Sequence, residues 1–141
     1  LTHYMLPVLK KQEQAYILNV ASTAAYQALP TFSLYAASKA FILSFSRGLR
    51  YELRNDHISV TCLSPGPVDT GFADRAGLSA LSEIAAKFNM HPDAVARIAI
   101  QGMLNKRSEL IPGFINKISA FASRILPKSI LEKAGANIYK V

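Results

Sequence analysis

The sequence has little of several features that mark common classes of protein. Its 141 residues include one cysteine, no tryptophan and no run of 18 or more apolar residues. A single cysteine excludes a disulfide within the chain, which fits a reducing compartment such as the cytoplasm, and Cys62 lies in an apolar run typical of a core strand. No segment is long and apolar enough to predict a membrane-spanning helix. The three histidines, His3, His57 and His91, lack metal-ligand spacing, so no metal site is predicted.

Acidic residues are also few, with nine Asp and Glu against 16 Lys and Arg. The resulting charge of +7 could indicate a nucleic-acid partner, but the basic residues are dispersed and form no arginine-rich block. We therefore do not expect nucleic-acid binding. Half of the residues are hydrophobic, and the length is sufficient for one domain with a packed core.

The chain begins with leucine rather than methionine, and residues 1–11 have the pattern of a helix already under way. Leu1, Met5 and Val8 keep helical spacing, although Pro7 interrupts the run. We therefore expect the chain to be the C-terminal part of a longer protein.

Apolar periodicity predicts an α/β fold built on parallel strands. Strands are expected at 15–21 and 58–63, a helix at 32–54 between them, a helix beginning at His91-Pro92-Asp93, and an edge strand at 109–111. The long helix should be buried along one stripe: Phe41, Ile42, Phe45, Leu49 and Leu53. A strand–helix–strand unit builds a parallel sheet, and ligands bind beyond the carboxyl ends of its strands.

Three side chains with complementary chemistry are expected at that edge. Ser22 follows the first strand, and Tyr35 and Lys39 are four residues apart, hence on one face of the helix. A phenol has a reference pKa of about 10, and a nearby ammonium lowers a phenol's pKa toward the range useful for proton transfer. Taken singly, the serine is more often a turn or cap residue and the pair part of a solvated helix face.

Together these residues resemble the short-chain dehydrogenase/reductase family. The segment Asn19-Val20-Ala21-Ser22 precedes Tyr35 by 13 positions, and Lys39 completes a Tyr-x-x-x-Lys motif. The resemblance implies that Ser22 hydrogen-bonds a substrate carbonyl, that Tyr35 donates the proton, and that Lys39 lowers the tyrosine pKa and holds the nicotinamide ribose. It also implies NAD or NADP as cofactor and a homodimer or homotetramer formed through the helices at 1–11 and 32–54.

The segment from Ser64 to Thr70 extends this resemblance. Two prolines and a glycine fix an irregular turn after the second strand, and Thr70 adds a hydroxyl. The segment resembles the family's Pro-Gly-x-x-x-Thr element, which implies that Pro65, Gly66, Val68 and Thr70 contact the nicotinamide. Residues 71–90 then resemble the family's segment that closes over the substrate. An ordinary surface loop is the alternative.

The tail, residues 114–141, carries an apolar helical stripe with a basic flank. The stripe consists of Phe114, Ile118, Phe121, Ile125 and Leu126, and the basic residues are Lys117, Arg124, Lys128, Lys133 and Lys140. A helix that covers the core or contacts another subunit is one interpretation. A basic amphipathic segment on an anionic membrane surface is the other.

The family's Gly-rich turn and Asn-Asn-Ala-Gly element are absent from these residues. Residues 1–141 are therefore identified as the C-terminal half of one NAD(P)-binding Rossmann-type domain, with about three strands of a doubly wound parallel sheet and flanking helices. The predicted function is NAD(P)-dependent interconversion of a carbonyl and an alcohol. The alternative is a catalytically inert fragment or interaction module that lacks the half of the domain holding the cofactor pyrophosphate.

Overall fold

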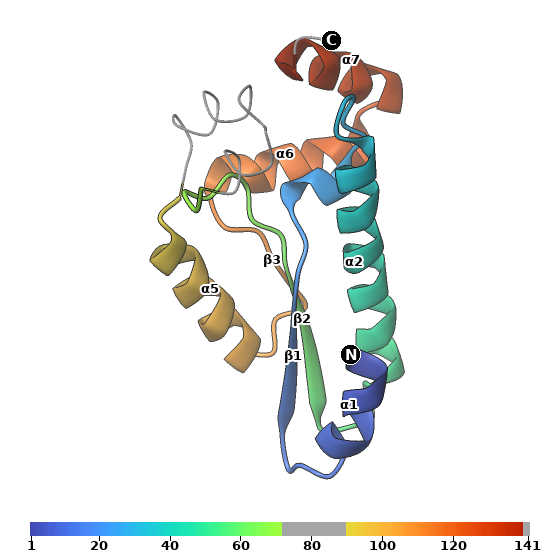
Figure 1. Cartoon of the computed structure of the whole chain (residues 1–141), viewed down its shortest axis with the longest axis vertical. Helices are drawn as coiled ribbons and strands as arrows, with labels where there is room; N and C mark the ends of the chain where they lie inside the picture. Colours follow the sequence, from blue (N-terminus) through green and yellow to red (C-terminus); the bar gives the residue numbers. More distant parts are fainter. Residues whose placement is uncertain (72–89, 140–141) are drawn as a thin grey trace.

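A computed structural model describes residues 1–71 and 90–139 (Figure 1). The elements in chain order are α1 (Thr2–Leu9), β1 (Ala15–Val20), the 3-10 helix η1 (Thr23–Tyr26), α2 (Ser33–Glu52), β2 (Ile58–Leu63), α5 (Pro92–Leu104), β3 (Glu109–Leu110), α6 (Phe114–Ile125) and α7 (Lys128–Tyr139). The segment 71–90, predicted to close over substrate, falls almost wholly outside the described residues.

The described strands form one parallel sheet in the order β1-β2-β3, which confirms the predicted strand–helix–strand unit. Ala15 pairs with Ile58 and Val20 with Leu63, so β1 and β2 run in register along their whole length. Every residue of β2 is buried, as expected for a central parallel strand. Within the described sheet β1 is an edge strand, paired on one side only.

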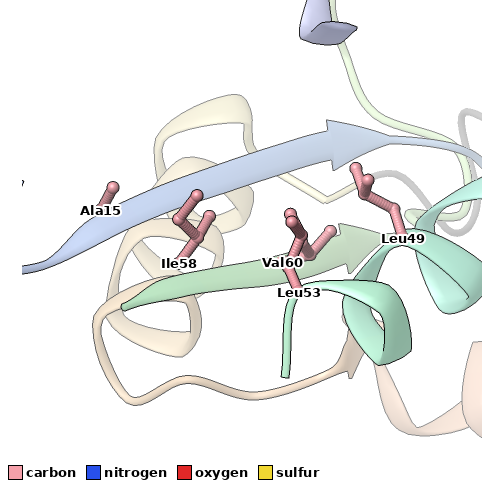
Figure 2. Packing of buried hydrophobic residues seen from close by; sticks show 5 residues of the cluster. All are labelled: Ala15, Leu49, Leu53, Ile58 and Val60. Carbon is pink, nitrogen blue, oxygen red and sulfur yellow. The ribbon is translucent and has the colours of Figure 1, made fainter. Parts of the chain in front are cut away.

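Helices cover both faces of the sheet (Figure 1). On one face, Leu49 of α2 and Leu53, which directly follows this helix, pack with Ala15, Ile58 and Val60, and Figure 2 shows these five side chains. On the other face, Val95 and Ala99 of α5 pack with Leu63. This covering on both faces explains why every residue of β2 is buried, the polar Ser59 and Thr61 included.

The long helix α2 has a different buried face from the predicted stripe. Leu49 and Leu53 are buried as expected, but Phe41 and Phe45 are 68% and 41% exposed and stack on each other. The side that packs inward carries smaller residues, namely Ala36, Leu43 and Ser46. Small side chains bring the helix close to the strands, so the aromatic side is left facing outward.

Two further elements differ from the prediction. Pro7 lies inside α1, and the helix continues to Leu9, two residues later. The tail forms two helices instead of one, since α6 ends at Ile125 and Pro127 precedes α7. A proline disfavours helical geometry in the residue before it, and Leu126 accordingly has an extended backbone with ψ of 145°.

Candidate active site

The carboxyl ends of β1 and β2 meet at one edge of the sheet, and their pairing continues beyond the strands. The Ala21 amide donates to the Leu63 carbonyl at 2.7 Å, and the Thr23 amide donates to the Pro65 carbonyl at 2.9 Å. Ser22, which lies between these two amides, is therefore held beside the Pro65-Gly66 turn. The structure brings these two predicted site segments together.

Ser22 is half-buried and precedes η1 as its N-terminal cap. Its Oγ accepts a hydrogen bond from the Ala24 amide at 3.1 Å. Capping by a serine oxygen is common at helix starts, and it explains part of the residue's position. Because that bond uses the oxygen as acceptor, the hydroxyl proton remains available for a further acceptor.

Tyr35 and Lys39 lie together in the first turns of α2. The Lys39 Nζ is 5.6 Å from the centroid of the Tyr35 ring and donates to the Val20 carbonyl at 3.3 Å. The Tyr35 ring packs against a small buried cluster that includes Ala24 and Leu29. Lys39 thus bonds to Val20, which precedes Ser22, and Tyr35 packs against a cluster that includes Ala24, which follows it.

The approach of α2 to η1 depends on the turn between them. Thr31 has a φ of 64°, a left-handed conformation that is rare for a β-branched residue. The Phe32 amide then donates to the Leu29 carbonyl at 3.1 Å, which closes the turn that begins the helix. Residue Thr31 therefore helps to place Tyr35 over η1.

The segment after β2 supplies the remaining predicted residues. Val68 packs its side chain on the α5 side of the core and pairs with Met90. The Thr70 hydroxyl donates to the Val68 carbonyl at 3.5 Å. Gly66 faces α6, and a Cβ placed on it would lie 2.5 Å from the Asn116 amide.

A polar network beside the site was not predicted from the sequence. The Tyr26 hydroxyl donates to Glu109 Oε1 at 2.6 Å, Arg47 binds Oε2 at 2.6 Å, and Arg124 binds Oε1 at 3.2 Å. These residues come from η1, β3, α2 and α6, so the network ties four elements together around the end of the sheet. Their separation in the sequence leaves no local pattern by which they could have been recognised.

The network fixes the charge state of its members. Burial, and then the hydrogen bond to Glu109, raises the pKa of Tyr26 well above its ordinary value. Burial acts to raise the pKa of Glu109, but the bond from Tyr26 and the bonds and charge of Arg47 outweigh it, so that pKa is lowered. Tyr26 therefore holds its proton, and Glu109 remains a carboxylate.

Residues 1–71 and 90–139 contain no group of three His, Cys, Asp or Glu side chains that could hold a metal ion. The buried Cys62 thiol is a core group whose pKa is raised by burial. The groups that the described residues bring to this edge include hydroxyls, a phenol, an ammonium and backbone groups.

In an open parallel α/β sheet, ligands bind beyond the carboxyl ends of the strands, where these side chains lie. The family model for short chain dehydrogenases matches residues 1–81. The chain belongs to the short-chain dehydrogenase family.

Individual proteins agree with this assignment. The chain is 33% identical to an uncharacterised oxidoreductase of Staphylococcus saprophyticus over 99 residues, which cover 70% of this chain and 40% of the relative. It is 30% identical to 17-beta-hydroxysteroid dehydrogenase 13 of Rattus norvegicus over 132 residues, covering 91% and 42%. The chain therefore spans less than half the length of these two relatives.

A solved structure supports the same fold. A short-chain dehydrogenase from Burkholderia cenocepacia in complex with NADP superimposes with a TM-score of 0.70 at 25% identity. The match covers 87% of this chain and 49% of that one.

Proposed function

We propose that this chain carries the proton-transfer residues of an NAD(P)-dependent oxidoreductase that interconverts a carbonyl and an alcohol. The observation that supports it best is the bond from Lys39 Nζ to the Val20 carbonyl, together with the position of that ammonium beside the Tyr35 ring. This pairing places a phenol and a cation next to the strand end that bears Ser22. In this proposal the chain is the C-terminal half of one nucleotide-binding domain.

The residues at the edge suit a nicotinamide nucleotide. An ammonium has three donors, and one is directed to the Val20 carbonyl, which leaves two for ribose hydroxyls. Ala37 and Ser38, both small and exposed, flank Lys39 and allow a ligand to approach the helix. We assign cofactor contacts to Tyr35, Lys39, Pro65, Gly66, Val68 and Thr70. When bound, the nucleotide supplies or accepts the hydride.

Residues of this chain would bind and protonate the carbonyl oxygen of the substrate. Ser22 donates its hydroxyl proton in a hydrogen bond to the carbonyl oxygen, which orients the carbonyl. Tyr35 delivers a proton to the same oxygen as the alcohol forms, and takes it back in the reverse direction. The Lys39 charge stabilises the phenolate left on Tyr35.

Replacing Tyr35 tests the role directly. In the protein as it occurs naturally, we expect Tyr35→Phe to lower turnover at least about 100-fold, the usual contribution of a general acid, while nucleotide binding is retained. Tyr51→Phe is the matched control, since Tyr51 lies on the same helix, is 68% exposed and is outside the site. Turnover is followed by oxidation of the reduced nucleotide, and binding by its fluorescence. Unchanged turnover in Tyr35→Phe would refute the proposal.

The alternative function, an interaction module, is supported by one feature. β1 is an edge strand in the described sheet, and its unpaired backbone groups could accept a strand from another chain. A natural protein that reduces no carbonyl compound of a broad panel, with either nucleotide, would favour this alternative.

The partners follow from the same reasoning. We propose a small-molecule substrate and a homodimer or homotetramer that contacts its neighbour through α1 and α2, whose exposed apolar residues include Met5, Val8, Phe41 and Phe45. A cytoplasmic location, with a membrane contact through residues 114–141, completes the proposal.

A further inference from the structure

Helix α6 packs with its large apolar side chains facing outward. Phe114, Ile118, Phe121 and Ile125 follow one another at intervals of four, three and four residues, so they share one face, and they are 77%, 53%, 63% and 66% exposed. On the inward side, Ala120 is buried and Ser123 is half-buried. The helix therefore does not cover the core with its apolar stripe, which overturns that part of the sequence prediction.

Polar bonds fix this orientation. At the start of the helix, Asn116 donates to the Pro112 carbonyl at 2.7 Å and lies against Gly66. At its end, Arg124 binds Glu109. Turning the apolar face inward would break these bonds, so the outward face is a consequence of how α6 is attached.

Basic residues flank the exposed face. Lys117 and Arg124 are seven residues apart and lie along one side of α6, and exposed Lys128 and Lys133 follow in α7. From residue 111 onward the sequence has five Lys and Arg and one acidic residue, Glu132. Lysine is depleted at the cores of protein interfaces, whereas an apolar face with a basic border is typical of helices on anionic membranes.

Helix α6 itself lies next to the proposed site. Figure 1 shows α6 crossing the end of the sheet where the strands terminate. Arg124 lies over the Tyr26 ring of η1 at 5.6 Å, and Gly135 of α7 lies close to Pro30, in the turn that leads into α2. A surface that holds α6 would therefore be near Ser22 and Tyr35.

We propose that α6 and the start of α7 dock on an anionic phospholipid surface, and that the substrate is an apolar carbonyl or alcohol dissolved in that bilayer. The docking is argued from the exposed face and its charges alone. The substrate class rests also on the proposed oxidoreductase function. No helix in residues 1–71 and 90–139 is long and apolar enough to cross a membrane.

Vesicle partition tests the docking without reference to activity. The natural protein is sedimented with vesicles of phosphatidylcholine alone or of phosphatidylcholine with phosphatidylserine. We expect partition onto the anionic vesicles, and a loss of at least tenfold in the double variant Ile118→Ser, Phe121→Ser. The double variant Ile100→Ser, Leu104→Ser is the control, because these residues on α5 are similarly exposed, at 51% and 53%, and should not alter partition.

A second double variant tests the basic residues that border the exposed face. Lys117→Glu combined with Lys128→Glu should lower partition onto the anionic vesicles at least tenfold and leave the weak binding to neutral vesicles unchanged. Absence of partition in the natural protein, or equal partition in the Ile118→Ser, Phe121→Ser variant, would overturn the docking. A dimer in vesicle-free solution that this variant dissociates would also overturn it, because a second copy would then cover the face.

Activity on two ketone substrates distinguishes an effect on membrane docking from an effect on catalysis. A long-chain ketone incorporated in anionic vesicles should be reduced at least tenfold more slowly by the Ile118→Ser, Phe121→Ser variant, while a short, water-soluble ketone is reduced at the natural rate. Equal slowing of both ketones would overturn the bilayer substrate. If the natural protein reduces neither ketone, the bilayer substrate is overturned. The broad panel of carbonyl compounds then decides the oxidoreductase proposal, and vesicle partition decides the docking.

Discussion

Two tyrosines lie near Ser22, and their surroundings give them different chemistry. The Tyr26 phenol donates to a carboxylate and its pKa is raised by burial, so its proton is retained. The Tyr35 ring, in contrast, lies beside the ammonium of Lys39. Tyr26 is thus tied to the Glu109 network, and Tyr35 is the phenol that lies beside the Lys39 ammonium.

The acid dependence of stability should report on Glu109. Its pKa is lowered in the folded state, so its stabilising effect is full above the ordinary value of 4.5 and is lost as the pH falls through the lower, folded value. We expect Glu109→Gln to cost about 1.5–3 kcal/mol at neutral pH, the range for bonds to charged groups.

Urea unfolding at neutral pH and at about pH 3 measures this effect. The difference in free energy of unfolding between the natural protein and Glu109→Gln should shrink as the pH falls toward the lowered pKa of Glu109, because the carboxylate then begins to take up a proton. Glu13→Gln is the control, since Glu13 is exposed and is not part of the network. A difference of equal size at both pH values would contradict the assigned role of the carboxylate.

At the scale of elements, α2 is held at both ends. Near its start Lys39 bonds to β1, and near its end Arg50 bonds to the Val60 carbonyl at 2.5 Å and to the Lys106 carbonyl at 2.7 Å. The helix is thus fixed against the sheet along its length, and the position of Tyr35 follows from that attachment.

The docking of α6 on the Pro65-Gly66 turn gives a second test. Gly66→Ala places a methyl group 2.5 Å from the Asn116 amide, and we expect a loss of about 1–3 kcal/mol in the free energy of unfolding from overpacking. Asn116→Ala removes the obstructing group, so the double variant should be more stable than the sum of the single effects by at least about 0.5 kcal/mol.

Gly48→Ala is the matched control for that experiment. A Cβ at Gly48 meets nothing within 4 Å, and the residue lies inside α2, so alanine there should stabilise the protein by about 0.5–1 kcal/mol. Additive effects of Gly66→Ala and Asn116→Ala in chemical unfolding would show that the two residues are not in contact.

At the scale of the whole molecule, two of the exposed apolar regions among the described residues bear on how the protein associates. One is the α6 face discussed above, and the other lies on α1 and α2, where Phe41 and Phe45 stack on the outside of the helix. Stacked exposed phenyl rings without a basic border are typical of a contact between protein subunits.

If α1 and α2 form the subunit contact, the double variant Phe41→Ser, Phe45→Ser should raise the dissociation constant of the oligomer at least about tenfold. The reason is that burying each phenyl ring contributes about 1.5–3 kcal/mol. Sedimentation equilibrium measures the shift. Leu104→Ser, 53% exposed on α5 and outside the proposed contact, is the control. A natural protein that is already monomeric would contradict the proposal.

The sequence by itself determined the strands, the long helix between them and the pairing of Tyr35 with Lys39. These features are local: β-branched runs favour strands, and residues four apart on a helix share a face wherever the helix lies. The strand at 58–63 and the capped helix start at His91 were accordingly predicted at the positions observed.

Only the tertiary structure decided which face of each helix points inward. Periodicity shows that Phe41 and Phe45, or Ile118 and Phe121, lie on one side, but the partner of that side depends on distant residues. The Tyr26–Glu109–Arg124 network joins residues up to 98 positions apart and holds the apolar side of α6 outward. Contacts of such separation form only once the sheet has assembled, so no pattern in neighbouring residues could indicate them.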